Sequence, residues 1–258
     1  MISRKQIGQA LRGLAVLIVH VSMAHAGSLE VNPVRVTLSA TQLVAAVTVR
    51  NSGSEPTVVQ LETESWAQHD GTDVLAPTSE VLATPPILTI QPGAARVVRV
   101  GLRRPPDAQQ ELTYRLFLRE VPPPEPISQG LRVALLISMP IFVVPPRLPG
   151  PEIHWRALRT QDGKIRVQAT NAGRSHIQLG QLEVAIAAGG EQVSSRNMSE
   201  YVLPDNSREW TVEAKSMPPA GTLLNILDQA DIGKVRSEVR LEDDARESKP
   251  ATPPTASR

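Results

Sequence analysis

The sequence contains no cysteine, and its charge is almost balanced, with 27 lysines and arginines against 26 aspartates and glutamates. The lack of cysteine excludes thiol catalysis, disulfide exchange and cysteine-ligated metals. An exported chain without disulfides needs large hydrophobic cores, which a chain of this length can supply. The net charge of +1 argues against nucleic-acid binding. Beyond the first 26 residues, which are considered separately below, no apolar run is long enough to cross a membrane.

The residue patterns of common enzymes are missing as well. The chain has no phosphate-binding loop, no G-x-G-x-x-G fingerprint and no G-x-S-x-G elbow. Beyond residue 26 the histidines are His69, His154 and His176, and no pair of them has the spacing of metal ligands. Ser175 and His176 are adjacent, but neighbours on a strand point to opposite faces and make a poor catalytic pair. We therefore expect no enzyme, no metal and no cofactor.

The first 26 residues have the three parts of a secretory signal peptide. A basic start is followed by an apolar run at residues 14–21 and by the small-x-small sequence Ala24-His25-Ala26. The alternative is a membrane anchor, but the run is too short to span a bilayer. We expect export with cleavage after residue 26.

The rest of the chain is a series of short strand-like runs separated by turn residues such as Pro92-Gly93. Its 23 prolines argue against long helices. The first group of expected strands lies within residues 28–39, 42–56, 57–71, 87–102, 111–124 and 131–146. The second group lies at residues 153–159, 164–173, 177–190, 200–206, 208–214 and 234–242.

The prolines between residues 145 and 151 indicate an extended hinge between two domains. The segments "AVTVRNSGSEPTVVQL" and "RVQATNAGRSHIQL" share a strand, asparagine turn, strand pattern, which suggests a duplicated architecture. We predict an all-β protein of two immunoglobulin-like sandwiches, at residues 27–146 and 147–241, followed by a disordered tail at 242–258. One larger barrel is the alternative.

The run "LRVALLISMPIFVVPP" at residues 131–146 is unusually apolar for one strand. A strand buried on both faces reads as a nearly continuous apolar run. As the last strand before the hinge, it could instead lie at an edge, where it would need a partner to cover it. An edge strand of this kind suits β-augmentation, in which it adds main-chain hydrogen bonds and apolar side chains to an incomplete sheet. The periodicity leaves both readings open.

Several stretches in this order resemble the periplasmic pilus-assembly chaperones. They are "NPVRVTL", "TVRNSGSEP", "LETESW", "ATPPILTIQPGAARVVRV", "YRLFLREVP", "LRVALLISMPIFVVP" and, in the second half, "YVLPDNSREW". In detail the chain looks most similar to the archaic, Csu-type branch. The resemblance covers nearly all of the chain after residue 26.

The resemblance implies that the last strand of the first domain is lent to a pilin subunit that lacks its own final strand. Carried over by position, the side chains that fill the pilin groove are Leu131, Val133, Leu135 and Ile137. The family also anchors the C-terminal carboxylate of the subunit with basic residues between the domains. Arg35 matches one anchor.

One branch of the family anchors the subunit carboxylate with two cationic residues, and the second of these is a lysine on the donor strand. This chain has Pro140 at that position. Arg115 is a candidate substitute, because its strand pairs with the donor strand in the family fold. For both arginines the alternative is an ordinary structural or solvated charge. The resemblance further implies structural roles for Trp66 in the sandwich core and for Arg99 and Glu111 as a supporting ion pair.

The expected function is that of a periplasmic chaperone that binds pilin subunits and passes them to an outer-membrane usher. It would use no nucleotide, bind no nucleic acid and act on no small-molecule substrate. The alternative is an exported two-sandwich structural or adhesive protein with no client.

Overall fold

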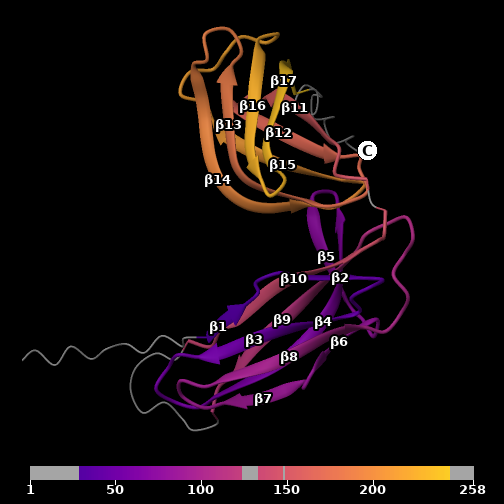
Figure 1. Ribbon diagram of the computed structural model, residues 1–258. Coiled ribbons are helices and arrows are strands. Elements are labelled where there is room, and N and C mark those ends of the chain that lie inside the picture. The colour runs from indigo at the N-terminus through magenta and orange to yellow at the C-terminus, as the bar shows by residue number, and fades with distance from the viewer. Residues whose placement is uncertain (1–28, 124–132, 148, 245–258) are drawn as a thin grey trace, which may run out of the picture.

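The computed structural model describes residues 29–123, 133–147 and 149–244, and the other residues lie outside this description, among them the expected signal peptide. The described residues form β-strands and connecting segments, arranged in two β-sandwiches that lie one above the other (Figure 1). This confirms the predicted fold class and rules out a single barrel. No helix among these residues is long and apolar enough to span a membrane.

The first sandwich is built from ten strands in two sheets. One sheet has the order β1-β3-β8-β6, and the other has the order β2-β10-β9-β4-β5, with β7 also paired to β4. The strands are β1 (Leu29–Asn32), β2 (Val36–Ser39), β3 (Val44–Asn51), β4 (Thr57–His69), β5 (Thr72–Pro77), β6 (Val81–Thr84), β7 (Ile87–Ile90), β8 (Ala95–Leu102), β9 (Leu112–Val121) and β10 (Leu136–Val144).

The alternating apolar side chains of these strands meet between the two sheets. On β8, for example, Val98 and Val100 are fully buried while Val97 and Arg99 face solvent. The segment at residues 28–39, expected as one strand, is two: β1 pairs with β3, and β2 pairs with β10 in the other sheet. The break lies at Pro33, which cannot donate a ladder hydrogen bond, so the chain changes sheets there.

The second sandwich is built from seven strands in one continuous pairing, β14-β13-β16-β17-β11-β12-β15. The long strand β17 connects its two layers, because it pairs antiparallel with β16 and parallel with β11. The strands are β11 (Ile153–Arg159), β12 (Lys164–Asn171), β13 (Ile177–Ile186), β14 (Gln192–Val202), β15 (Asn206–Glu213), β16 (Leu223–Ala230) and β17 (Gly233–Asp243).

The C-terminal tail begins later than expected. β17 runs to Asp243, and Asp244 is buried with its carboxylate paired to Arg166. The Asp244 N–H donates to the carbonyl of Arg159 at 3.1 Å, so the chain is still part of the sandwich there. The prediction of a tail from residue 242 is therefore wrong at its start, because polar side chains at the end of β17 are held by partners on β11 and β12.

The two asparagine turns noticed in the sequence have the same hydrogen bonds. After β3, Asn51 donates to the carbonyls of Glu55 and Ile90 and accepts from the N–H of Gly53 at 2.9 Å. After β12, Asn171 makes the matching bonds in the second sandwich, accepting from Gly173 at 3.0 Å. Each side chain is buried, so both turns depend on an internal amide. The two sandwiches therefore share this turn, which is the part of the suggested duplication that the sequence pattern contained.

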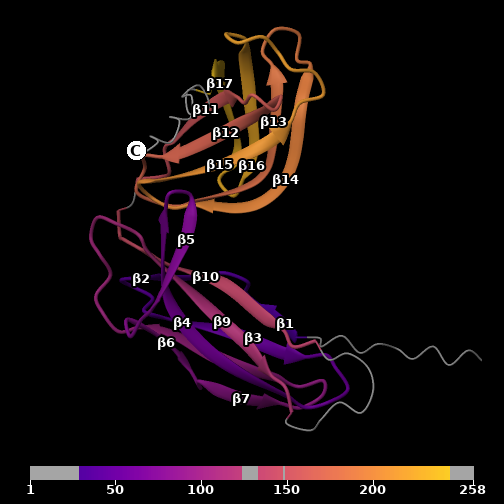
Figure 2. The same ribbon diagram turned by 180° about the vertical axis from the view of Figure 1, so that it is seen from behind.

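The hairpin of β4 and β5 extends from the first sandwich to the underside of the second (Figures 1 and 2). The other connection is the chain itself, which leaves β10 and reaches β11 through a segment rich in prolines. The face of β10, β9 and β4 between these two connections is turned toward the second sandwich. This face contains the candidate functional site.

Candidate functional site

Strand β10 has two halves with different surroundings. Residues 141–143 lie between two neighbours, because they pair with β9 on one side and with β2 on the other, and Val144 continues the pairing with β2. Among the residues that the structure describes, residues 136–140 pair with β9 alone. The second half of β10 is therefore a central strand, and its first half is an open edge. Each of the two interpretations of the sequence holds for one half.

The main-chain groups of the open half point away from β9 at every second residue. Glu120 donates to the carbonyl of Leu135 at 2.9 Å, so the main-chain groups of Leu135 face β9. Because these directions alternate in an antiparallel pair, the groups of Leu136 and Ser138 face the open side. So does the nitrogen of Pro140, which therefore interrupts no bond to β9. On this side the described strands provide no ladder partner for residues 136–140, so the edge offers donors and acceptors to another strand.

The predicted donor row lies on the side of β10 that continues the sandwich core. Ile137 packs at the rim of the core formed by the alternate residues after it, Leu135 is half-buried, and Val133 is 61% exposed. Leu131 lies outside the described residues. On the opposite face Leu136 is 52% exposed. These apolar side chains beside an open edge form a surface that a further strand could cover.

An aromatic cluster lies between the sandwiches. Trp66 of β4 and Phe142 of β10 pack against Tyr201 and Leu203 of the second domain. The Trp66 and Tyr201 rings meet edge to face with centroids 5.5 Å apart. The guanidinium of Arg115 lies 3.7 Å from the centroid of the Trp66 ring, a cation–π contact. The cluster holds the candidate anchor Arg115 in place.

Arg115 lies directly opposite Pro140 in the register of β9 and β10. Residues opposite each other in a pair of strands project to the same face, so Arg115 places its charge beside the position where the family's donor strand has lysine. Burial lowers the pKa of the Arg115 guanidinium, while the Asp73 carboxylate, 3.9 Å away, acts in the other direction. Arginine remains charged even so.

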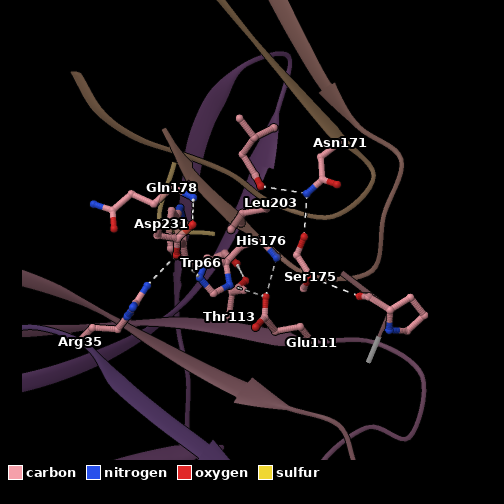
Figure 3. Close-up of polar contacts among 12 residues, drawn as sticks. Arg35, Trp66, Glu111, Thr113, Asn171, Ser175, His176, Gln178, Leu203 and Asp231 are labelled. Atoms are coloured by element: carbon pink, nitrogen blue, oxygen red, sulfur yellow. Dashed lines mark hydrogen bonds and ion pairs between the residues drawn. The ribbon is translucent and has the colours of Figure 1, made fainter. Parts of the chain in front are cut away.

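The other candidate anchor, Arg35, lies in the loop before β2 and is already paired. Its Nη1 is 2.9 Å from Oδ2 of Asp231, which belongs to the turn between β16 and β17 of the second domain (Figure 3). Oδ1 of Asp231 accepts from the main-chain N–H of Gln178 at 3.0 Å. Burial raises the pKa of the Tyr201 phenol, and the charges of Arg35 and Arg115 act against this shift. Both candidate anchors therefore lie around one tyrosine.

Glu111 forms a second cross-domain contact. Its Oε2 accepts from the main-chain N–H of His176 at 2.9 Å and lies 2.8 Å from Nδ1 of the same residue. Nε2 of His176 lies 3.8 Å from Asp231 (Figure 3). Glu111 is only 4% exposed, so the bonds from His176 satisfy a buried carboxylate.

The β4–β5 hairpin makes the third contact. Gln68 donates to the carbonyl of Tyr201 and accepts from the N–H of Leu203, each at 2.9 Å. Beside it, the carboxylate of Asp73 is paired with Arg208. Burial would raise the pKa of Asp73, but the hydrogen bond from Gln68 and the charge of Arg208 outweigh it and lower the pKa. Through Gln68 the hairpin therefore bonds both a main-chain carbonyl and a main-chain N–H of the second domain.

Two structural assignments made from the resemblance are wrong. Trp66 is buried, but it belongs to the cluster between the domains and not to the core of the first sandwich, because β4 extends past that core into the hairpin. Arg99 and Glu111 form no ion pair among the described residues. The Arg99 side chain faces solvent on the outer sheet, whereas Glu111 at the start of β9 points to His176.

The sequence reasoning missed the second-domain half of the site. No local pattern assigns a role in the site to Asp231, His176 or Tyr201, because their partners are distant in the chain: Arg35 and Asp231 are 196 positions apart. Gln68 was part of an expected strand with no assigned role. Within the described part of the chain, no group of three histidine or acidic side chains could hold a metal ion.

The chain therefore consists of two immunoglobulin-like β-sandwiches joined by aromatic contacts and ion pairs, with an open strand edge on the first. Residues 28–149 match the family model of the pili and flagellar-assembly chaperones, PapD N-terminal domain. This match confirms, for the first domain, the resemblance to the pilus-assembly chaperones that the sequence showed. No curated protein matches the chain in sequence.

Solved chaperone structures have the same two-domain fold. The CsuC–CsuE chaperone–tip adhesion subunit pre-assembly complex, from archaic chaperone–usher Csu pili of Acinetobacter baumannii, has a chain that matches with a TM-score of 0.63 at 18% identity, over 84% of this chain and 100% of that chain. The E. coli chaperone DraB matches with a TM-score of 0.55 at 22% identity, over 84% and 97%. The Salmonella enterica SafA pilin–SafB chaperone complex matches with a TM-score of 0.57 at 18% identity, over 84% and 97%.

Proposed function

We propose that this protein is an exported, periplasmic chaperone that binds pilin subunits by lending them strand β10 and delivers them to an outer-membrane usher. It carries out no chemical reaction and needs no cofactor. The observation that carries the proposal is the open edge at residues 136–140, flanked by exposed apolar side chains, in a strand that is otherwise central. The matched chains from the CsuC–CsuE and SafB–SafA complexes support the assignment of a pilin-like partner.

The geometry of β2 favours one direction for the client strand. β2 runs parallel to β10 and begins at Val36, beside Ile141. A strand added to the open half would be collinear with β2, and its near end would meet Arg35. If it ran parallel to β10, that end would be its C-terminus, with a carboxylate for Arg35 to bind. An antiparallel strand would bring an amine to the same cation, so the parallel direction is favoured.

The side chains of the donor row would then become part of a shared core. Val133, Leu135 and Ile137 lie in line with the alternate residues of β10 that fill the first sandwich. A client strand and its sheet would cover Val133, which is now exposed. Each aliphatic side chain buried in this way contributes about 1.5–3 kcal/mol, and the entropy lost on association offsets much of the total. The resulting complex would be tight but displaceable at the usher.

The test is a periplasmic pull-down of the tagged full-length chain, coexpressed with a candidate pilin from the same cell. Wild type should recover the pilin in a one-to-one complex, and Val133→Asp should not, because it would bury a charge in the pilin groove. Val97→Asp is the matched control, since Val97 is 50% exposed on the outer face of β8. It should bind as wild type does. Equal recovery by all three proteins, each shown to be folded by circular dichroism, would refute the proposal.

A further inference from the structure

The cation proposed to bind the client is not free in the unliganded chain. Arg35 Nη1 lies 2.9 Å from a carboxylate oxygen of Asp231, and the two side chains are 41% and 20% exposed. The pair bridges the two domains, since Arg35 precedes β2 and Asp231 follows β16. A carboxylate therefore already occupies the position where a client carboxylate is proposed to bind.

The Asp231 carboxylate is held in this position by its own domain. Its main-chain N–H donates to the carbonyl of Gln178 at 3.0 Å, and its Oδ1 accepts from the N–H of Gln178 at 3.0 Å. These two bonds fix the β16–β17 turn to the start of β13 and leave Oδ2 directed at Arg35 (Figure 3). The second domain thus presents one fixed carboxylate oxygen to the anchor.

We infer that Asp231 is an internal stand-in for the client's C-terminal carboxylate, which occupies Arg35 in the free chaperone and competes with the client for it. This inference rests on the proposed function, because it takes Arg35 as the anchor. It adds that the carboxylate site is filled before a client arrives, and that the second domain supplies the competing group.

Competition has two physical consequences. A client carboxylate at Arg35 adds a negative charge beside Asp231, so the cation must be shared or Asp231 must move away. Exposed ion pairs are weak enough for such an exchange. Losing the pair also removes one contact between the domains, so client binding would loosen the second sandwich from the first. Glu111, close to His176, keeps its own contact and would limit this movement.

The test compares wild type with Asp231→Asn, using a fluorescent ten-residue peptide in which valine alternates with threonine and lysine. The peptide is made with a free C-terminal carboxylate and as the C-terminal amide. Asp231→Asn should bind the carboxylate form about threefold to fivefold more tightly than wild type, the range expected for an exposed ion pair. The amide should bind both proteins equally, and Arg35→Ala combined with Asp231→Asn should abolish the gain.

The matched control is Asp243→Asn, which also removes one negative charge from an exposed carboxylate, 3.7 Å from Arg159 on the β11–β17 pair. It should leave both affinities unchanged. If Asp231→Asn binds the carboxylate form no more tightly than wild type, or if the amide gains as much, Asp231 is not a competitor. If wild type binds neither peptide, the open edge captures no strand, and the proposed function fails together with this inference.

Discussion

His176 lies flat on Phe142, with ring centroids 3.5 Å apart and ring planes 5° apart. Phe142 belongs to β10, the proposed donor strand, and His176 comes just before β13 of the second sandwich. The stacked rings therefore connect β10 to the second domain, and the same histidine is hydrogen-bonded to Glu111. The position of the second domain is tied directly to the strand proposed to bind the client.

Removing this ring should loosen the domains without unfolding either sandwich. His176→Ala removes the stack on Phe142 and the side-chain bond to Glu111, while the main-chain bond to Glu111 remains. We expect faster amide hydrogen exchange at Phe142 and Leu203, and a larger radius of gyration in small-angle X-ray scattering. His154→Ala, at an exposed histidine paired only with Glu152, should change neither. Unchanged exchange in His176→Ala would show that the other contacts between the domains hold them together without the His176 ring.

Asn51 and Asn171 should each stabilise only the sandwich to which they belong. Asn51→Ala and Asn171→Ala each leave buried main-chain groups without partners, which we expect to cost about 2–4 kcal/mol of unfolding free energy. Hydrogen exchange should show the loss in the first sandwich for Asn51→Ala and in the second for Asn171→Ala. Asn197→Ala, on the exposed side of β14, should cost less than about 0.5 kcal/mol. Equal loss in both sandwiches would mean that they unfold as one unit.

The strands that the sequence predicted best have strong alternation and clear turns at their ends. The segment at residues 153–159 is β11 with both expected ends. Strand β5 was missed because all six of its residues are exposed, so it has no buried face to mark it. Strand β16 was missed because several consecutive residues, from Leu224 to Ile226, are buried and hide the period of two.

The site was predicted in part for a similar reason. The apolar run at residues 131–146 indicates a strand, but its two halves differ only in whether β2 lies beside them, and that depends on a strand about 100 positions earlier. The candidate cations Arg35 and Arg115 came from the resemblance. The partner of Arg35, Asp231, depends on how the two domains meet, and the stack of Arg115 on Trp66 depends on the pairing of β9 with β4. Local patterns encode neither.

Both arginines should contribute to client affinity. If Arg35 and Arg115 bind the client carboxylate, Arg35→Ala and Arg115→Ala should each weaken capture of the pilin by about tenfold to a hundredfold, the range for a charged hydrogen bond. Deleting the last residue of the pilin should reduce the difference between variant and wild type. Arg99→Ala, at an exposed arginine on the outer face of β8, serves as the control. Full affinity in Arg115→Ala would leave Arg35 as the anchor and assign Arg115 to packing on Trp66.

The buried carboxylate of Asp228 should make the second sandwich more stable as the pH falls. Asp228, on β16, accepts from the main-chain N–H of Gly180 at 3.1 Å, while its buried Oδ2 has no hydrogen-bond partner within the described ranges. Burial raises its pKa, and the main-chain hydrogen bonds only partly oppose this. Because the folded-state pKa is the higher one, the folded chain binds the proton more tightly. The contribution of Asp228 to stability is then complete below the unfolded pKa of about 3.9 and is lost as the pH rises through the folded value.

Asp228→Asn keeps the shape of the side chain and removes its charge, so it should be more stable than wild type at pH 7. The difference in unfolding free energy should shrink as the pH is lowered, because the raised pKa lets the wild-type carboxyl take up a proton in the folded state before it does so in the unfolded state. Urea unfolding at a series of pH values measures this difference, and Asp205→Asn, at an exposed carboxylate near Arg174, controls for a general charge effect. A difference that stays constant from pH 4 to pH 8 would mean that Asp228 does not change its protonation over this range.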